Sequence, residues 1–385
     1  MLTRIGGQMY SRLKLCSIDV KGYKSFDREG QRIDFGDVTV LIGANGSGKS
    51  NCVSFFKLLN YMRTGALQDY IGRQGYADSI LHYGSSVTSR MEAELVFRYS
   101  TGGENRYSFS LAHASGDTLI FTDEKVSWKS SEDNSPLVHT LGAGHKESQL
   151  IESRDNNLTS RIVYNALSHC KVFQFNDTTS TAKVRNHGYI EDNKYLRSNA
   201  GNLAAFLYAM KTGRDTEKYY ARLIKFIKKV MPQMHDFELS PSVLNKDYIA
   251  LNWKEAGQDY LFSPGQLSDG SLRFISLAAL LLQPEKSLPE VIVLDEPELG
   301  LHPSAISALS GMIRLASKHS QVILATQSTR LVDEFDPSEI VVVERDELHG
   351  RSVFRRLDQE TLSDWLESYS LSEIWEKNVF GGQPG

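Results

Sequence analysis

Hydrophobic and polar positions follow two periods along the chain, and the change from one to the other predicts the elements. Alternation with a period of two covers 13–20, and an almost unbroken apolar run at 38–42 predicts a buried strand. Helical spacing follows from 51 to 62. Further alternating runs, separated by glycine-containing turns, predict an antiparallel layer; they cover 91–99, 106–111 and 118–122.

The remainder of the chain predicts a polar surface loop at 130–148, a short strand at 172–175 and helices at 202–210 and 216–230. The last third then alternates helix and strand, with segments at 272–282, 291–294, 304–319, 321–325 and 340–343. Such alternation is typical of a largely parallel sheet flanked by helices. We therefore expect an α/β fold with a mostly parallel sheet, an antiparallel β layer and a helical insertion.

These patterns divide the chain into four predicted regions. They are an N-terminal lobe with an antiparallel subdomain at 9–182, a helical insertion at 183–240, a C-terminal lobe at 241–357 and a helical tail at 358–385. The first region is taken from Met9 because the alternating pattern begins just after it. Whether translation starts at Met1 or Met9 stays open.

Composition and charge exclude several classes of protein. With 41% hydrophobic and 23% charged residues the chain is near the globular average, and its net charge of −4 gives no bulk attraction to nucleic acid or lipid. The longest apolar run, 274–282, is too short to span a bilayer, so no membrane partner is expected. The three cysteines form no CxxC pair, which favours a reducing, cytoplasmic setting.

A phosphate loop is the strongest chemical signal. Residues 43–50 read GANGSGKS and satisfy G-x-x-x-x-G-K-[ST] between a predicted strand and a predicted helix. In this arrangement backbone N–H groups and a helix N-terminus bind phosphate, the lysine reaches the β and γ phosphates, and the serine hydroxyl binds Mg²⁺. We expect ATP and Mg²⁺ as cofactors, bound by Gly43, Asn45, Gly46, Ser47, Gly48, Lys49, Ser50 and Asn51.

Two carboxylates end the apolar strand at 291–294. Residues at the carboxyl end of a parallel strand face the ligand crevice of an α/β sheet. We expect Asp295 to hold Mg²⁺ and Glu296 to accept a proton from the attacking water. A strand followed by Asp-Glu is common in isolation, and the phosphate loop upstream makes this pair a functional candidate.

The segment 267–271, LSDGS, lies between these two motifs and resembles the ABC signature LSGGQ. The order phosphate loop, signature, Asp-Glu is that of ABC ATPases. The resemblance implies that Ser268 and Gly270 of one protomer close on the γ-phosphate held by the other. It also implies a switch position at Gln327, where the family has histidine, and a Q-loop glutamine at Gln174 as a metal ligand. Lys24 in the YKSF turn is a candidate for phosphate contact; a surface role for Gln174 or Lys24 remains the alternative.

The N-terminal pattern IDVKGYKSF, together with LIGANGSGKSN, DEPELGLHP and ATQS, resembles the SMC, RecF and OLD branch of ABC ATPases. The chain lacks the heptads and CxxC of long coiled-coil members, and too little chain follows Ser328 for a TOPRIM nuclease domain. Glu344, Asp346 and Glu347 are interpreted as a solvated strand end.

Two functions follow as expectations. The first is a nucleotide-gated homodimeric ATPase that acts as the sensor of a bacterial anti-phage defence system and controls a partner effector, a nuclease or toxin, in trans. The second is a DNA repair or chromosome maintenance ATPase of RecF or SMC type that clamps DNA. A lysine-bearing helix face at 222–229 is the candidate contact with nucleic acid, and a solvated helix side is its alternative.

Overall fold

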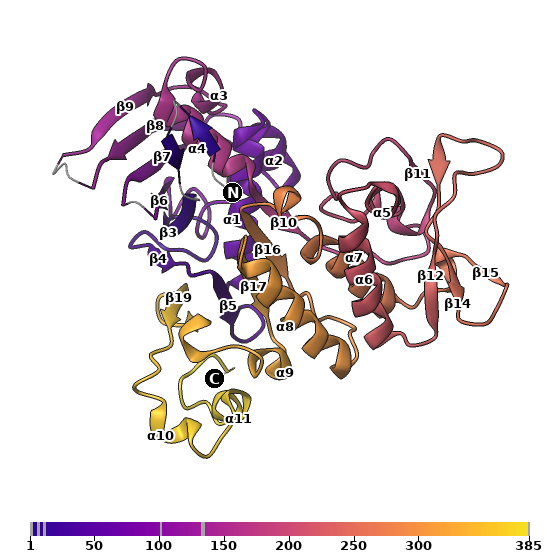
Figure 1. The fold of residues 1–385 in the computed structure, drawn as a ribbon. Helices are drawn as coiled ribbons and strands as arrows, with labels where there is room; N and C mark the ends of the chain where they lie inside the picture. Colours follow the sequence, from indigo (N-terminus) through magenta and orange to yellow (C-terminus); the bar gives the residue numbers. More distant parts are fainter. Residues whose placement is uncertain (1–2, 6–7, 11–12, 101, 132–134, 384–385) are drawn as a thin grey trace.

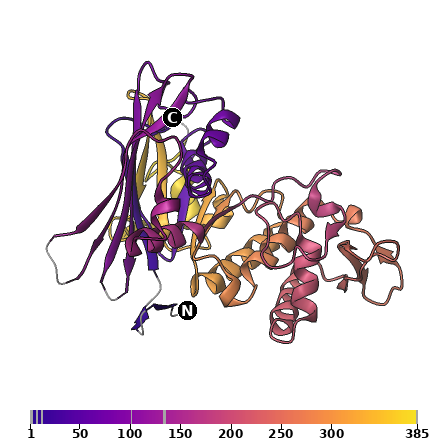
Figure 2. The same cartoon turned by 90° about the horizontal axis from the view of Figure 1, so that it is seen from above.

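A computed structural model describes residues 1–385 except 1–2, 6–7, 11–12, 101, 132–134 and 384–385. Two six-stranded sheets form the body of the molecule, and a helical lobe with small sheets extends to one side of it (Figures 1 and 2). Both views show the helices α5 and α6 in this lobe, away from the strands of the antiparallel sheet.

The first sheet is parallel apart from one edge strand. Its order is β10 (Cys170–Phe173), β16 (Val291–Asp295), β17 (Gln321–Thr326), β5 (Val38–Ile42), β18 (Ile340–Asp346) and β19 (Arg351–Arg356), and only β19 runs antiparallel to its neighbour. Alternate side chains enter different cores: Val40 and Ile42 pack with the helical lobe, whereas Leu41 faces the antiparallel sheet. Burial on both faces explains why these strands read as continuous apolar runs.

The second sheet is antiparallel throughout. Its order is β4 (Gln31–Asp34), β3 (Leu13–Lys21), β6 (Arg90–Tyr99), β7 (Glu104–Ala114), β8 (Thr118–Lys129) and β9 (Leu137–Gly142). The predicted loop at 130–148 was wrong in part, because β9 lies within it. Leu137 and Val138 are both exposed, so this edge strand has no buried face and leaves no alternating pattern.

A buried glutamine joins the two sheets. Gln321, at the start of β17, accepts a hydrogen bond from Leu15 N at 2.8 Å and donates to Leu15 O at 2.9 Å and Gly36 O at 3.1 Å. Leu15 lies beside a register shift in the pairing of β3 with β6. The glutamine amide therefore hydrogen-bonds to backbone groups that the irregular pairing of β3 with β6 leaves unpaired.

Helices cover both faces of the parallel sheet. Helix α1 (Lys49–Arg63) packs between the two sheets, and α2 (Leu67–Arg73), α3 (Leu150–Ser153) and α4 (Leu158–Ser168) lie nearby. The opposite face contacts α7 (Asp269–Leu281), α8 (Pro303–Ser317) and α9 (Thr329–Val332), with α5 (Leu203–Thr212) and α6 (Glu217–Val230) packed on α7. The C-terminal helices α10 (Ser363–Leu366) and α11 (Leu371–Glu376) complete this core.

Short elements make up the rest of the described chain. They are the hairpin β1 (Thr3–Ile5) and β2 (Gln8–Tyr10), the pair β11 (Gly188–Tyr189) and β13 (Tyr248–Ile249), the sheet β12 (Met234–Glu238), β14 (Asn252–Glu255) and β15 (Leu261–Phe262), and 3₁₀ turns at 183–185, 264–266, 285–287 and 337–339. In the described part of the chain, no helix combines the length and apolarity needed to cross a bilayer.

Candidate active site

The phosphate loop connects the central strand β5 to helix α1. Gly43, Gly46 and Gly48 all have positive φ, and a side chain at Gly48 would come within 2.0 Å of Ser352 Oγ. By contrast, a Cβ on Gly46 would meet nothing within 4 Å, and Asn45, Gly46 and Ser50 are exposed. The loop is therefore packed on its inner side and open on the side where the N-terminus of α1 begins.

Lys49 lies across this loop. Its Nζ donates to the carbonyl oxygens of Gly43 at 2.5 Å and Ala44 at 2.8 Å, and the residue is buried. Burial lowers the pKa of Lys49, while Glu296, Asp295 and Glu298 act in the opposite direction. An ammonium group that donates to two carbonyl oxygens at the start of a helix fits an anionic phosphate group.

Asp295 ends β16 beside the helix α1. Its Oδ2 accepts a hydrogen bond from Gln174 Nε2 at 2.8 Å, and Lys57 Nζ donates to Gln174 Oε1 at 2.6 Å. Among the described residues, Asp295 Oδ1 is buried without a hydrogen-bond partner, and burial raises the pKa of this carboxyl group. A buried, unsatisfied carboxylate oxygen fits a hard cation such as Mg²⁺, which takes one or two protein carboxylates together with phosphate oxygens and water.

The two acidic residues after Asp295 have different surroundings. Glu296 has a φ of 47° and accepts a hydrogen bond from Gln327 Nε2 at 2.6 Å, so the glutamine after β17 orients it. Glu298 accepts hydrogen bonds from Thr326 Oγ1 at 2.5 Å and from Gln327 N at 3.3 Å, and burial raises its pKa. Gln327 therefore orients Glu296, while Glu298 ties the loop after β16 to the end of β17.

Lys24 lies in the turn after β3, and its neighbour Ser25 adjoins the phosphate loop, because a Cβ on Gly48 would lie 2.8 Å from Ser25 Oγ. Its φ is 48°, and its Nζ donates to Gln74 Oε1 at 3.3 Å. Burial lowers the pKa of Lys24, and the nearby charge of Lys57 lowers it further. Asn51 Nδ2 donates to Ser25 Oγ at 2.8 Å, which ties this turn to the first turn of α1.

The signature segment caps helix α7 in the other lobe. Ser268 Oγ accepts a hydrogen bond from Ser271 N at 3.1 Å, and a Cβ on Gly270 would come within 2.3 Å of Gly300 O. Ser268 is exposed. Within the described residues, the hydrogen bonds of this segment do not reach the phosphate loop.

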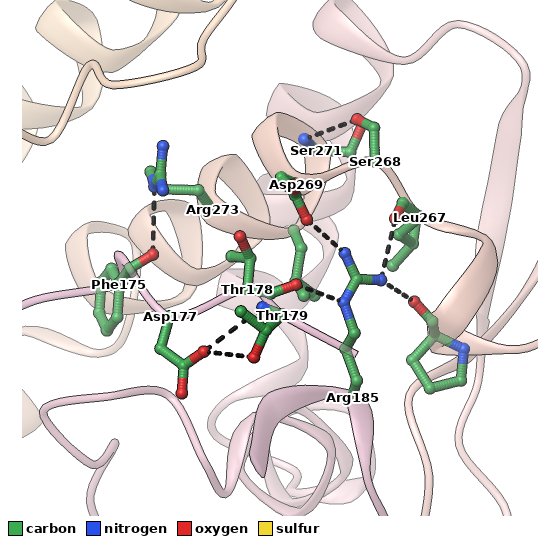
Figure 3. A network of polar contacts seen from close by, with 12 residues as sticks. Phe175, Asp177, Thr178, Thr179, Arg185, Leu267, Ser268, Asp269, Ser271 and Arg273 are labelled. Atoms are coloured by element: carbon green, nitrogen blue, oxygen red, sulfur yellow. Dashed lines mark hydrogen bonds and ion pairs between the residues drawn. The ribbon is translucent and has the colours of Figure 1, made fainter. Parts of the chain in front are cut away.

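Arg185 holds the signature segment to the loop that follows Gln174 (Figure 3). Its guanidinium donates to Thr178 O at 2.7 Å, to Pro264 O at 2.7 Å, to Leu267 O at 2.9 Å and to Asp269 Oδ1 at 2.7 Å. Arg273, on α7, donates to Phe175 O at 3.1 Å. Polar contacts through Arg185 therefore join the loop that follows Gln174 to the signature segment.

The structure brings most of the predicted residues together and separates two of them. Hydrogen bonds or charge interactions link Lys49, Gln174, Asp295, Glu296 and Gln327, and Lys24 lies in the turn tied to α1, whereas Ser268 and Gly270 lie at the N-terminus of α7. Sequence reasoning missed Lys57, Arg185 and Arg273, and it gave Glu298 no role of its own. Only Glu298 carried a signal, an acidic residue two positions after the Asp-Glu pair; the others are ordinary cations until the fold places them. The roles of all these residues stay predictions.

Comparison with known families addresses the class of protein. Residues 38–333 match the profile described as "AAA domain, putative AbiEii toxin, Type IV TA system", and this range includes the phosphate loop, the signature segment and the Asp-Glu pair. The chain belongs to this AAA domain family. The family places the chain among P-loop ATPases, and the protein is an ATPase.

Individual relatives support this placement of the AAA domain. The energy-coupling factor transporter ATP-binding protein EcfA2 of Enterococcus faecalis is 31% identical over 128 residues, a match that covers 31% of this chain and 42% of EcfA2. A solved Smc head bound to the C-winged helix domain of ScpA has a TM-score of 0.56 at 17% identity, covering 91% of this chain and 99% of that one. The Smc head with an extended coiled coil and the C-terminal domain of ScpA, derived from Pyrococcus furiosus, has a TM-score of 0.56 at 16% identity and covers 92% and 99%. These structural likenesses concern the fold.

Proposed function

We propose that this AAA domain protein is a nucleotide-gated ATPase that works as a homodimer. Each copy would bind ATP on its own phosphate loop and present Ser268 and Gly270 to the nucleotide of the other copy. The observation that carries the proposal is the position of the signature segment: it caps the exposed N-terminus of α7, and its hydrogen bonds stay within its own lobe. A helix N-terminus turned to solvent suits an anion brought by a second molecule.

Each residue near the phosphate loop has a task in this proposal. Lys49 and the backbone of the loop bind the phosphates, while Ser50, Asp295 and Gln174 hold Mg²⁺. Mg²⁺-ATP supplies the phosphoanhydride bond and the charge neutralisation of its phosphates. Glu296 accepts the proton of the attacking water, and Gln327 keeps its carboxylate in place through the 2.6 Å hydrogen bond.

Glu296→Gln tests the site and its gate together. The variant keeps Lys49 and Asp295, so it should bind ATP, lose turnover by about 10²-fold or more, and accumulate as a dimer in sedimentation velocity with ATP. Ser268→Arg should bind ATP as a monomer and remain a monomer. Wild-type turnover in the first variant rejects Glu296 as the base, and ATP-dependent dimerisation of the second rejects the shared site.

We further propose that the protein is the cytoplasmic regulatory subunit of a bacterial anti-phage system, with an effector in trans. The family description names a putative AbiEii toxin and a type IV toxin–antitoxin system, which supports the defence setting of this proposal. Capture of tagged protein from its native host, with and without phage infection, should recover a nuclease or toxin. Absence of such a partner, together with unchanged phage plating after deletion of the gene, would falsify the proposal.

A second function has its own support. The likeness to Smc heads favours a DNA-clamping ATPase, and α6 presents Lys225, Lys228 and Lys229 to solvent. If this face contacts duplex phosphates, reversal of the three charges should reduce the slope of log K against log salt by about 2.7. An unchanged slope removes α6 from the interface.

A further inference from the structure

A cleft of about 970 Å³ lies on the far side of the Gln174 contacts. One wall comes from the second half of α1 and from the strand β10, and the other from the segment 191–199, before α5, and from 283–289, after α7. Its volume is at the upper end of the range of about 300–1,000 Å³ for small-ligand sites. Lys57 and Gln174, which are linked by a hydrogen bond, both line it.

The cleft is lined mainly by positive charge. Six cationic side chains face it, against the carboxylates of Glu191 and Asp192; the cations are Lys57, Arg63, Lys171, Lys194, Arg197 and Lys286. Arg197 pairs with Asp192 at 2.6 Å. Among the described residues, the remaining five have no carboxylate within ion-pair distance.

Among the described residues, the cations on the wall formed by α1 and β10 have no anionic partner, and Arg63 Nη1 donates to Tyr164 Oη at 3.2 Å. Arg63 Nε is buried and has no hydrogen-bond partner within the described residues, and the pKa of Lys171 is lowered first by burial and then by the charge of Arg63. Two cations close enough to oppose each other are stabilised when an anion lies between them. This wall is therefore suited to a phosphate group.

Two tyrosines add a different chemistry. Tyr61 lines the cleft from α1, and Tyr195 lines it from the facing segment with 62% of its surface exposed. Lys194 Nζ lies 5.3 Å from the centroid of the Tyr195 ring. Aromatic rings next to cations bind single-stranded nucleic acids, because unpaired bases stack on the rings while the cations contact the backbone.

We infer that this cleft binds a short single-stranded oligonucleotide, and that occupancy is communicated to the nucleotide site through Lys57. A duplex keeps its bases stacked inside and offers the tyrosines nothing to stack on. Lys57 Nζ is 2.6 Å from Gln174 Oε1, and Gln174 Nε2 is 2.8 Å from Asp295 Oδ2. A phosphate that draws Lys57 away from Gln174 changes the surroundings of the carboxylate proposed to hold Mg²⁺.

Binding is tested first, without ATP or an effector. Fluorescence anisotropy with fluorescein-labelled DNA and RNA strands of four and twelve nucleotides, and with a twelve-base-pair duplex, measures affinity between 50 and 200 mM salt. Lys194→Glu/Lys286→Glu changes two exposed cleft residues. Lys146→Glu/Lys246→Glu is the matched control, since both are exposed and lie outside the cleft lining.

We expect single strands to bind more tightly than the duplex, and the four-nucleotide strand to retain most of the affinity. The cleft variant should lose at least about tenfold in affinity, and the slope of log K against log salt should fall by about 1.4, or 0.7 for each lost phosphate contact. Equal loss in the control variant, wild-type affinity in the cleft variant, preference for the duplex or absence of binding by the wild-type protein each overturns the inference. Binding of the twelve-nucleotide strand alone would show that the cleft is only part of a longer surface and overturns the claim of a short ligand.

The connection to the nucleotide site rests on the proposed function and is tested separately with Lys57→Met. In the wild-type protein a saturating oligonucleotide should change ATP turnover by at least threefold, and in Lys57→Met this change should disappear while the strand still binds. Retention of the full effect in the variant, or no effect in the wild-type protein, refutes the route through Lys57. Absence of ATP turnover in the wild-type protein, with intact strand binding, would instead count against the proposed ATPase site.

Discussion

Replacing Arg185 by methionine should loosen the signature segment without touching the phosphate loop. Methionine keeps an unbranched side chain of similar length but loses the charge and all donors. Three backbone carbonyl oxygens, those of Thr178, Pro264 and Leu267, then lose hydrogen bonds of 2.7, 2.7 and 2.9 Å. At about 1 kcal/mol net for each bond, the local cost is about 3 kcal/mol. Asp269 is largely exposed, so its ion pair is left out of this sum.

Hydrogen exchange at the start of α7 measures this cost directly. A local loss of about 3 kcal/mol corresponds to roughly a 100-fold faster exchange, since about 1.4 kcal/mol equals a factor of ten. The informative amide is that of Leu272, which donates to Ser268 O at 3.0 Å. Arg161→Met is the matched control, because Arg161 also donates to two backbone carbonyl groups but lies on α4. Exchange at Leu272 within threefold of wild type, or an equal change in the control, would show that Arg185 does not hold this helix end.

Three further predictions concern single positions. Gly270→Ala should destabilise the signature turn and weaken ATP-driven dimerisation, because the new Cβ would lie 2.3 Å from Gly300 O. Its control is Gly311→Ala inside α8, where a Cβ would meet no atom closer than 4.0 Å. This control should stabilise the protein by up to about 1 kcal/mol in denaturant unfolding. Because burial raises the pKa of Asp295, the folded protein loses stability as pH rises through that pKa and the carboxyl group becomes charged. Without nucleotide, Asp295→Asn should therefore have a higher melting temperature than wild type at about pH 7.5. This difference in melting temperature should vanish as pH falls toward about 3.9. A lower melting temperature at pH 7.5 contradicts this sign. Gln321→Leu leaves three backbone groups without partners and should cost about 2–4 kcal/mol by urea unfolding; a loss below 1 kcal/mol would mean that water replaces the amide.

The phosphate loop and the parallel strands were predictable because their signals are local. A loop that must present consecutive N–H groups needs its glycines and lysine within eight residues, and strands buried on both faces must be apolar throughout. The predicted mixed α/β class with a P-loop ATPase fold is confirmed by the likeness to Smc heads. Edge strand β9 escaped prediction because neither of its faces is buried; only its ladder with β8 makes it a strand.

The sequence by itself predicted a phosphate loop at residues 43–50 and a parallel strand that ends in carboxylates. Only the tertiary structure decided which distant side chains join them. Lys57 reaches Gln174 across 117 positions, and Arg185 reaches Asp269 across 84. Such partners carry no periodic or contiguous signal, because a hydrogen bond depends on positions in space that the packing of sheets and helices sets. The same packing places the signature segment on a different lobe from the phosphate loop.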